Sequence, residues 1–235
     1  MSPCQLTTSK GFPFERHRVV TDDGYVITMH RLPGNSRKKR RRKTPVLLMH
    51  GLMLSSSVWL LDSKKENLAF KLHDQGFDVW VGNHRGNEFG RAHVTLDPDE
   101  DAEKFWDFSF DEMGQFDVPA LVDHVLKVTK SEKVSFVGHS QGCVVLLSAA
   151  VQRPGFGGKI SEAYFLGPAA YVAHTGSSLA NMGCFVKWVA RYVYPDEFKG
   201  DILQYVGSYC SHWLFSGICS HLIGNAAGFS RFVLI

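Results

Sequence analysis

The sequence lacks an uninterrupted apolar run of about 18 residues, the length that a transmembrane helix requires. Its first thirty residues contain no continuous apolar segment of the kind found in a secretory signal peptide. It also has no Asn-x-Ser/Thr site for N-glycosylation, and no His, Cys or Asp cluster with the spacing of metal ligands. We therefore expect a chain with no membrane span, no targeting signal, no metal and no cofactor.

Excess positive charge is confined to one short segment. The net charge is +3 over 235 residues, but the run Arg37–Lys43 alone holds seven basic residues, so the rest of the chain is net acidic. Turn signals flank the run, which favours a solvated loop over an anionic-membrane contact, a nuclear signal or a processing site. Nucleic-acid binding ranks last, because no aromatic or groove-reading element accompanies the run.

Cysteine is scarce, and its number is odd. Of five cysteines, Cys143 lies in an apolar helix-like run and is expected to be a small buried hydrophobic residue. Cys210 and Cys219 are nine positions apart in an aromatic-rich tail. They could form a disulfide in an oxidising compartment or remain two free thiols, and the sequence favours neither.

Apolar residues make up 44% of the chain, enough to fill a sizeable core. An Asp-Gly turn at residues 21–24 predicts an antiparallel hairpin at the start of the fold. Short apolar runs that end at Gly or His predict strands of a covered parallel sheet. The expected strands are 17–20, 25–29, 45–49, 77–81, 133–137 and 162–166, and the expected helices are 67–76, 116–129 and 143–152.

The regular alternation of strand and helix from residue 45 to residue 168 predicts a mostly parallel, doubly wound α/β sheet. In such sheets the site lies at the carboxyl ends of the strands, which would bring residues 50–52, residues 83–86 and Ser140 to one rim. Beyond residue 170 the alternation stops, and aromatic residues crowd a helical-looking stretch. We expect residues 1–170 to form the core and residues 171–235 part of a helical lid or cap.

The segment Gly138-His139-Ser140-Gln141-Gly142 is the most informative motif of the chain. An apolar strand-like run leads into it and a helix-like run leads out, which is the context that a nucleophile elbow requires. Glycine-x-serine-x-glycine arises by chance often enough that the pattern alone is weak evidence. In this context Ser140 is predicted to be a strained, exposed nucleophile at the start of a helix.

Oxyanion stabilisation can be assigned to the same rim. The backbone N–H of Gln141 follows the nucleophile, and that of Leu52 lies in the loop after the first parallel strand, so both are candidate donors to an oxyanion. His50, Gly51 and His139 are expected to border the substrate. His139 is excluded as the catalytic base because adjacent positions of an elbow do not converge, and His84 is expected to be structural.

With these motifs in place, the chain resembles the acid lipase family of α/β-hydrolases, which contains lysosomal acid lipase, gastric lipase and related steryl ester hydrolases. The resemblance implies an α/β-hydrolase fold and hydrolysis of a lipid ester at a lipid–water interface, through an acyl-serine intermediate. It also implies that Cys210 and Cys219 form a disulfide of the cap. Intact members of the family are secreted, lysosomal or lipid-associated. The matching segments are Gly11–Pro13, Asp23–Tyr25, Arg31–Pro33, His50–Leu52, Asp78–Asn83, Arg85–Asn87, Phe105–Trp106, Phe108–Met113, Asp117, Pro119–Ala120, Gly138–Gly142 and Gly167–Pro168.

The chain departs from this family in its second half. The family order is Ser, then Asp, then His on loops after late strands, whereas no strand-like segment follows Leu166. We therefore expect a C-terminally truncated lipase in which the late strands and the triad Asp and His are missing. Loss of the base would lower the rate by about 10⁴- to 10⁶-fold. The remaining candidates for those roles are Asp196, Asp201, His174, His212 and His221.

Two other functions remain open. A complete small hydrolase with a relocated triad would need one of the three histidines of the cap-like region. A non-catalytic lipid-binding protein would bind esters or fatty acids without Ser140. The acyl chain, the alcohol, the compartment and the oligomeric state have no signal in the sequence.

Overall fold

A computed structural model describes residues 2–34, 45–61 and 63–168 of the chain. These residues belong to the unit Met1–Ala170. The basic run Arg37–Lys43, the predicted lid and the pair Cys210 and Cys219 lie outside the described residues, as do Asp196, Asp201, His174, His212 and His221.

The described residues form a six-stranded sheet with the order β1-β2-β4-β3-β5-β6. Strand β1 pairs antiparallel with β2, and β2 pairs antiparallel with β4, whereas the β4-β3-β5-β6 part is parallel. The predicted hairpin, the later parallel strands and the mostly parallel α/β class are thereby confirmed. The strands are β1 Glu15–Val20, β2 Val26–Leu32, β3 Val46–Met49, β4 Val79–Val81, β5 Val134–His139 and β6 Ile160–Leu166.

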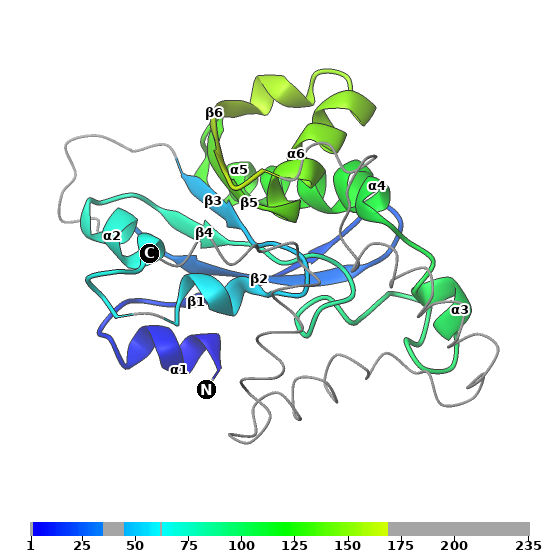
Figure 1. The fold of residues 1–235 in the computed structure, drawn as a ribbon, viewed down its shortest axis with the longest axis horizontal. Coiled ribbons are helices and arrows are strands. Elements are labelled where there is room, and N and C mark those ends of the chain that lie inside the picture. The colour runs from blue at the N-terminus through cyan, green and yellow to red at the C-terminus, as the bar shows by residue number, and fades with distance from the viewer. Residues whose placement is uncertain (1, 35–44, 62, 169–235) are drawn as a thin grey trace, which may run out of the picture. The chain divides into compact units, whose positions relative to one another are not determined.

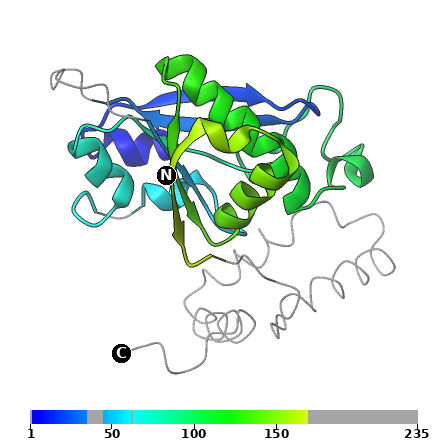
Figure 2. The ribbon, with the colours of Figure 1, turned by 90° about the horizontal axis from the view of Figure 1, so that it is seen from above.

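Helices cover both faces of the sheet (Figures 1 and 2). One face carries α5 (Val118–Thr129) and α6 (Gln141–Gln152), and the other carries α1 (Pro3–Thr8) and α2 (Leu68–Asp74). The expected start of α2 is confirmed, because the Asn67 side chain accepts a hydrogen bond from the Ala69 N–H at 2.9 Å. The remaining helical segments are the 3₁₀ turns η2 (Ser56–Trp59) and η4 (Phe156–Lys159), the short helices α3 (Ala102–Phe105) and α4 (Phe110–Glu112), and the π-helix η3 (Met113–Asp117).

Strand β3 shows why the parallel strands are continuously apolar. Its alternate side chains point to opposite faces of the sheet. Leu47 and Met49 therefore enter the core beneath α5 and α6, while Val46 and Leu48 enter the core beneath α1 and α2. Because both faces are covered, every residue of the strand is buried.

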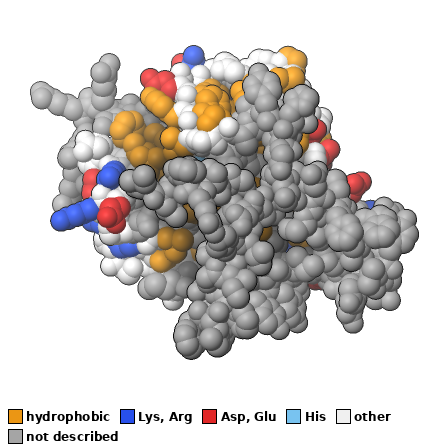
Figure 3. Space-filling model, in the orientation of Figure 1, with side chains coloured by type: hydrophobic (Ala, Val, Ile, Leu, Met, Phe, Trp, Pro, Cys, Tyr) orange, Lys and Arg blue, Asp and Glu red, His pale blue; other side chains and the backbone are white. Residues whose placement is uncertain are grey.

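Strand β6 has the opposite environment. It pairs with β5 on one side, and every residue from Ser161 to Leu166 is exposed. Tyr164, Phe165 and Leu166 are 52%, 39% and 41% exposed, so apolar surface gathers at this end of the sheet. Hydrophobic side chains are visible there at the top of Figure 3, where Figure 1 places β6.

Candidate active site

Ser140 lies in the sharp turn between β5 and α6. Its backbone angles are φ 51° and ψ −112°, and a positive φ is rare for a residue with a side chain. The Ser140 N–H donates to the Leu166 carbonyl of β6 at 2.9 Å, and the Ser140 carbonyl accepts from the Cys143 N–H at 3.0 Å. Strain of this kind persists only where the surroundings fix it, and it is frequent at functional sites. The strand, turn and helix predicted around Ser140 are all present.

Close backbone contacts fix the turn against the end of β3. A Cβ added to Gly142 would lie 2.6 Å from the Met49 carbonyl oxygen, so only glycine fits between α6 and β3. A Cβ added to Gly51 would lie 3.1 Å from both the Ser140 Cβ and the His139 Nδ1. The loop after β3 therefore packs directly on the serine turn, as expected for a segment that presents an oxyanion donor.

The loop after β3 is ordered by His50. This side chain is 2% exposed, and its Nδ1 lies 2.8 Å from the Gly51 carbonyl oxygen. Its Nε2 lies 3.1 Å from the Asn87 Nδ2, which can donate to it when the Nδ1 carries the proton. The imidazole of His50 thus fixes the loop, and substrate contacts from this segment would come from backbone atoms. Leu52, two positions later, is 57% exposed.

A chain of buried polar side chains continues from Asn87 into the protein. The Asn87 Nδ2 donates to the Asn83 Oδ1 at 2.9 Å, and that oxygen also accepts from the Ser56 N–H at 2.8 Å. The Asn83 Nδ2 donates to the Thr28 carbonyl at 2.6 Å and to the Ser56 Oγ at 3.0 Å. His30 ends the chain, with its Nδ1 2.9 Å from the Ser56 Oγ. Sequence reasoning gave Asn83 and Asn87 only as a family signature, and their hydrogen bonds now link the loop at Ser140 to β2.

The histidines of this region are held neutral. Burial lowers the pKa of His30 and of His50 to about 4. Burial, and then the nearby His50, place the pKa of His84 well below its usual range, and the two rings meet edge to face at 4.8 Å. His84 is thus packed inside the protein, as expected for a structural residue. Because the imidazoles of His30, His50 and His84 are neutral, none of the three contributes a positive charge to the site.

Arg85 anchors the segment after β4. Its Nε donates to the Asp117 Oδ1 at 2.8 Å, and its terminal nitrogens donate to Asp23 at 2.6 and 2.9 Å. The guanidinium lies over the Tyr25 ring at 3.9 Å, and the Tyr25 hydroxyl donates to the Phe105 carbonyl. Burial raises the pKa of Asp117 to about 6 against the attraction of Arg85. Sequence analysis placed Asp23, Arg85 and Asp117 in separate motifs, and the structure joins them into one ion-pair cluster.

The acid and base of a triad are not part of the described site. Among residues 2–34, 45–61 and 63–168, no side chain hydrogen-bonds the Ser140 Oγ. The ring of His139 lies against Gly51, while Cys143 is buried and its Sγ lies 3.1 Å from the Gly138 carbonyl. The same ranges contain no cluster of three potential metal ligands and no helix long and apolar enough to cross a membrane.

The fold and the strained serine turn define a class of protein. The model of the "alpha/beta hydrolase fold" family matches residues 44–210, and that of the "Partial alpha/beta-hydrolase lipase region" matches residues 4–63. The chain belongs to the α/β-hydrolase family.

Within this class the chain is similar to acid lipases. It is 37% identical over 238 residues to a human protein, "Lysosomal acid lipase/cholesteryl ester hydrolase", and 35% identical over 237 residues to "Gastric triacylglycerol lipase" of Mus musculus. Each comparison covers 98% of this chain but 59% and 60% of the relative. "Lipase 1" of Drosophila melanogaster is 43% identical over 175 residues, covering 74% of this chain and 38% of that protein. The chain thus spans about 60% of the length of the mammalian relatives.

Solved structures show the same fold at low identity. A thermophilic esterase from Thermogutta terrifontis has a TM-score of 0.50 at 19% identity, covering 76% of this chain and 54% of that chain. The epoxide hydrolase CorEH also has a TM-score of 0.50, at 17% identity, covering 77% of this chain and 57% of that chain. Because hydrolases of different chemistry share this fold, the likeness supports the fold alone.

Proposed function

We propose that this chain carries the nucleophile and oxyanion site of a serine ester hydrolase that acts on lipid esters, either triacylglycerols or steryl esters. The observation that carries the proposal is the strained, positive-φ backbone of Ser140 between β5 and α6, with the Gly51 loop packed on it. The similarity to lysosomal acid and gastric lipases supports the substrate class. Residues 1–170 would form the hydrolase core, and residues 171–235 part of a lid that meets the lipid–water interface.

In the proposed reaction, the Ser140 Oγ attacks the ester carbonyl carbon and gives its proton to a general base. The carbonyl π electrons move to oxygen, and the backbone N–H groups of Leu52 and Gln141 stabilise the resulting oxyanion. Collapse of the intermediate breaks the bond to the alcohol, which leaves with the proton and yields the acyl-Ser140. Attack by water on this ester then releases the fatty acid and restores the serine.

The general base must come from outside the described residues. His174, His212 and His221 are the histidines of the cap-like region, with Asp196 and Asp201 as carboxylates that could orient one of them. If none of them serves, the base belongs to another polypeptide segment, and this chain alone turns over slowly. Either case leaves Ser140 in the same role.

Hydrolysis of a short-chain p-nitrophenyl ester, measured together with fluorophosphonate labelling, tests the proposal. If a base within this chain completes the site, we expect both signals, and expect Ser140→Ala to abolish both; if the base is missing, folded protein should show neither turnover nor labelling. Ser148→Ala is the matched control, because Ser148 is a serine of α6 whose Oγ accepts from the Gln152 side chain and donates to Asp111. Labelling that survives Ser140→Ala would refute the role of Ser140.

A non-catalytic lipid-binding role is the second candidate. It is favoured by one observation, the lack of a described side chain that hydrogen-bonds the Ser140 Oγ. It predicts that folded protein shows neither turnover nor labelling, and that fatty-acid or ester binding is unchanged in Ser140→Ala. Loss of that binding on mutation of Ser140 would argue against it.

A further inference from the structure

The described arginines differ in whether a carboxylate neutralises them. Arg16 and Arg18 of β1 are exposed, and neither forms an ion pair with any residue of the described part of the chain. The other arginines in that part each pair with a carboxylate: Arg31 with Glu15 and Asp78, Arg85 with Asp23 and Asp117, Arg91 with Asp99, and Arg153 with Asp22. Two neighbouring guanidinium groups thus have no carboxylate partner within the described part of the chain.

These two arginines line a hollow of about 290 Å³. Its walls come from β1, from β2 and from the segment after β4. Two hydrogen bonds hold that segment along β2: the Val26 N–H donates to the Ala92 carbonyl at 2.8 Å, and the Thr28 N–H donates to the Phe89 carbonyl at 2.7 Å. The complete lining is Arg16, Arg18, Val26, Thr28, Glu88, Phe89, Arg91 and Ala92. The lining thus holds Arg16 and Arg18, which have no carboxylate partner in the described part of the chain, together with Glu88 and with Arg91, which pairs with Asp99.

Glu88 is the one acidic residue in the lining of the hollow, and its carboxylate already accepts a hydrogen bond. The Glu88 Oε1 accepts from the Ser55 Oγ at 2.8 Å. The positive charge also acts inward, since burial and then the charge of Arg16 lower the pKa of His30. Charges that only protect an edge strand from pairing would not need to converge with Arg91 from a separate segment. The convergence indicates a site that attracts an anion.

Exposed apolar residues adjoin the hollow. Ser55, which bonds Glu88, follows Leu52, Met53 and Leu54, whose side chains are 57%, 57% and 37% exposed. The Asn87 side chain lies 3.5 Å from the Leu54 carbonyl, which joins the two loops a second time. Apolar side chains beside arginines are the combination that binds the boundary between anionic headgroups and acyl chains.

We propose that the hollow of Arg16, Arg18 and Arg91 binds the anionic headgroup of a lipid, and that Met53 and Leu54 insert beside it into the acyl region. The ligand class is a phosphate or carboxylate presented on a lipid surface. This proposal extends the proposed function by giving the chain a surface that would bring the loop at Ser140 to its substrate. It requires no turnover, so it can be tested independently of the reaction.

The experiment is vesicle flotation with the full chain carrying Ser140→Ala, at low and at high salt. The vesicles are phosphatidylcholine alone, or phosphatidylcholine and phosphatidylglycerol in equal parts. We expect preferential binding to the anionic vesicles that weakens with salt. Arg16→Gln with Arg18→Gln should weaken it about 25-fold, on the basis of about fivefold for each charge.

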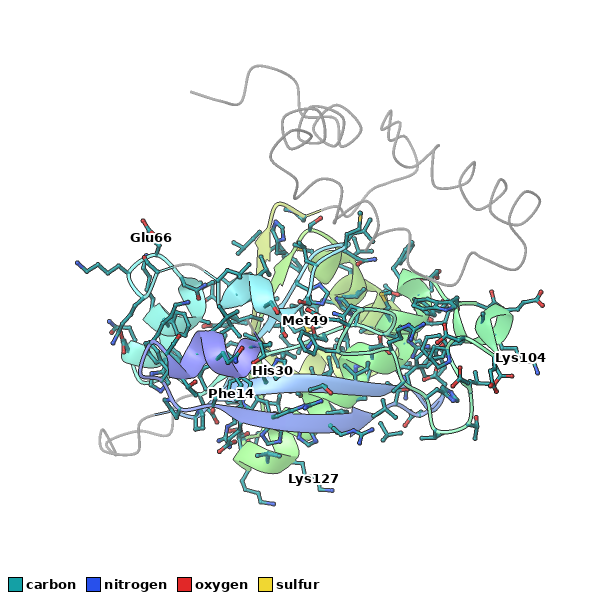
Figure 4. All side chains as sticks on the ribbon, turned by 90° about the horizontal axis from the view of Figure 1, so that it is seen from below. Phe14, His30, Met49, Glu66, Lys104 and Lys127 are labelled. Atoms are coloured by element: carbon teal, nitrogen blue, oxygen red, sulfur yellow. The ribbon has the colours of Figure 1, made fainter. Side chains whose placement is uncertain are left out.

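The matched control is Lys127→Gln with Lys133→Gln, which removes the same charge from exposed positions. Lys127 lies on the opposite side of β1 and β2 from Phe14 and His30 (Figure 4). This control should retain at least half of the binding, whereas Met53→Gln should reduce binding to both vesicle types. Equal losses in the two charge variants would overturn the proposal, as would equal binding to the two vesicle types.

Inorganic phosphate distinguishes the two sources of the anion. Calorimetry measures whether inorganic phosphate binds the protein in the absence of vesicles. If it binds, if this binding requires Arg16 and Arg18, and if phosphate does not displace the protein from vesicles, the hollow is a site for a free anion and the lipid proposal fails. Because all arms use Ser140→Ala, a lack of ester hydrolysis in the wild-type chain has no bearing on this result. Conversely, failure of the vesicle arm leaves the proposed reaction of Ser140 intact.

Discussion

Strands β5 and β6 are neighbours in one parallel sheet, yet their environments are opposite. β5 is buried from Val134 to Gly138, whereas β6 is exposed along nearly its whole length. The difference lies in their neighbours, because β5 has strands on both sides and helices over both faces. The serine turn is thus built on the closed part of the sheet, while β6 contributes one backbone acceptor, the Leu166 carbonyl.

This contrast predicts large effects for mutations in the closed part and small ones at the edge. The largest should come from Asp117→Asn, which removes a fully buried partner of Arg85. Breaking a buried pair typically costs about 3–5 kcal/mol, and because Asp23 still pairs with Arg85 we expect the lower end of that range. Asp22→Asn is the control, because its pair with Arg153 is largely exposed and should contribute less than about 1 kcal/mol. Urea unfolding of both variants measures the difference, and equal losses would contradict it.

The second prediction concerns the contact between α6 and β3. Gly142→Ala should destabilise the fold by about 3 kcal/mol, because the new Cβ would meet the Met49 carbonyl at 2.6 Å and neither backbone can easily move. Gly157→Ala is the control, since no atom lies within 4 Å of a Cβ at that position. The midpoint of urea unfolding should fall sharply for the first variant only. A similar midpoint for both would mean that the turn is loosely packed.

The third prediction is a loss of stability in acid. The folded-state pKa values of His30 and His50 are about 4, below the usual 6.5, so between these pH values only the unfolded chain takes up their protons. The stabilisation is present above pH 6.5 and is lost as the pH falls towards 4, by about 3 kcal/mol for each histidine. Asp117 acts oppositely, because its raised pKa lets the folded state bind a proton first.

His30, His50 and Asp117 together should therefore give a net loss of about 3 kcal/mol between pH 6.5 and 4, and the lowered pKa of His84 adds to this loss. Urea unfolding at a series of pH values measures it. His30→Asn should flatten the dependence, since one of the histidine contributions is removed. A stability that is constant or rises on acidification would show that these histidines are not neutral in the fold.

Most of the fold could be predicted from local patterns. Short apolar runs located the parallel strands, because strands covered on both faces need no polar positions. The helix α1 has a signal that the sequence analysis did not use, since the Ser2 side chain caps the helix and the Gln5 side chain bonds back to the Ser2 N–H. The π-helix Met113–Asp117 has no comparable pattern, so only the structure reveals it.

The candidate site was predictable only in part. The glycines and Ser140 act through local backbone geometry, and such geometry leaves a motif in the sequence. Apart from Asn87, the hydrogen-bond partners of the Asn83 and Arg85 side chains are 27 to 62 positions away in the chain, so no local pattern indicates them. The hollow of Arg16, Arg18 and Arg91 likewise depends on how the segment after β4 packs along β2.

The smallest effect on stability, and the clearest on association, is expected at β6. An exposed strand edge with apolar side chains is a template for pairing with a second chain. Phe165→Lys should reduce concentration-dependent association, because a charge at an edge opposes such pairing, while the free energy of unfolding changes by less than about 0.5 kcal/mol. Sedimentation velocity over a range of protein concentrations measures the association.

Val151→Lys is the appropriate control for this edge. Val151 is 83% exposed on α6, so the change removes apolar surface and adds the same charge without touching a strand edge. If both variants associate less, general apolar contact is the cause, and the contrast between β5 and β6 does not explain association. If only Phe165→Lys associates less, the backbone edge of β6 is the site of association. The two changes differ chiefly in whether the new charge lies on a strand that can pair with another strand.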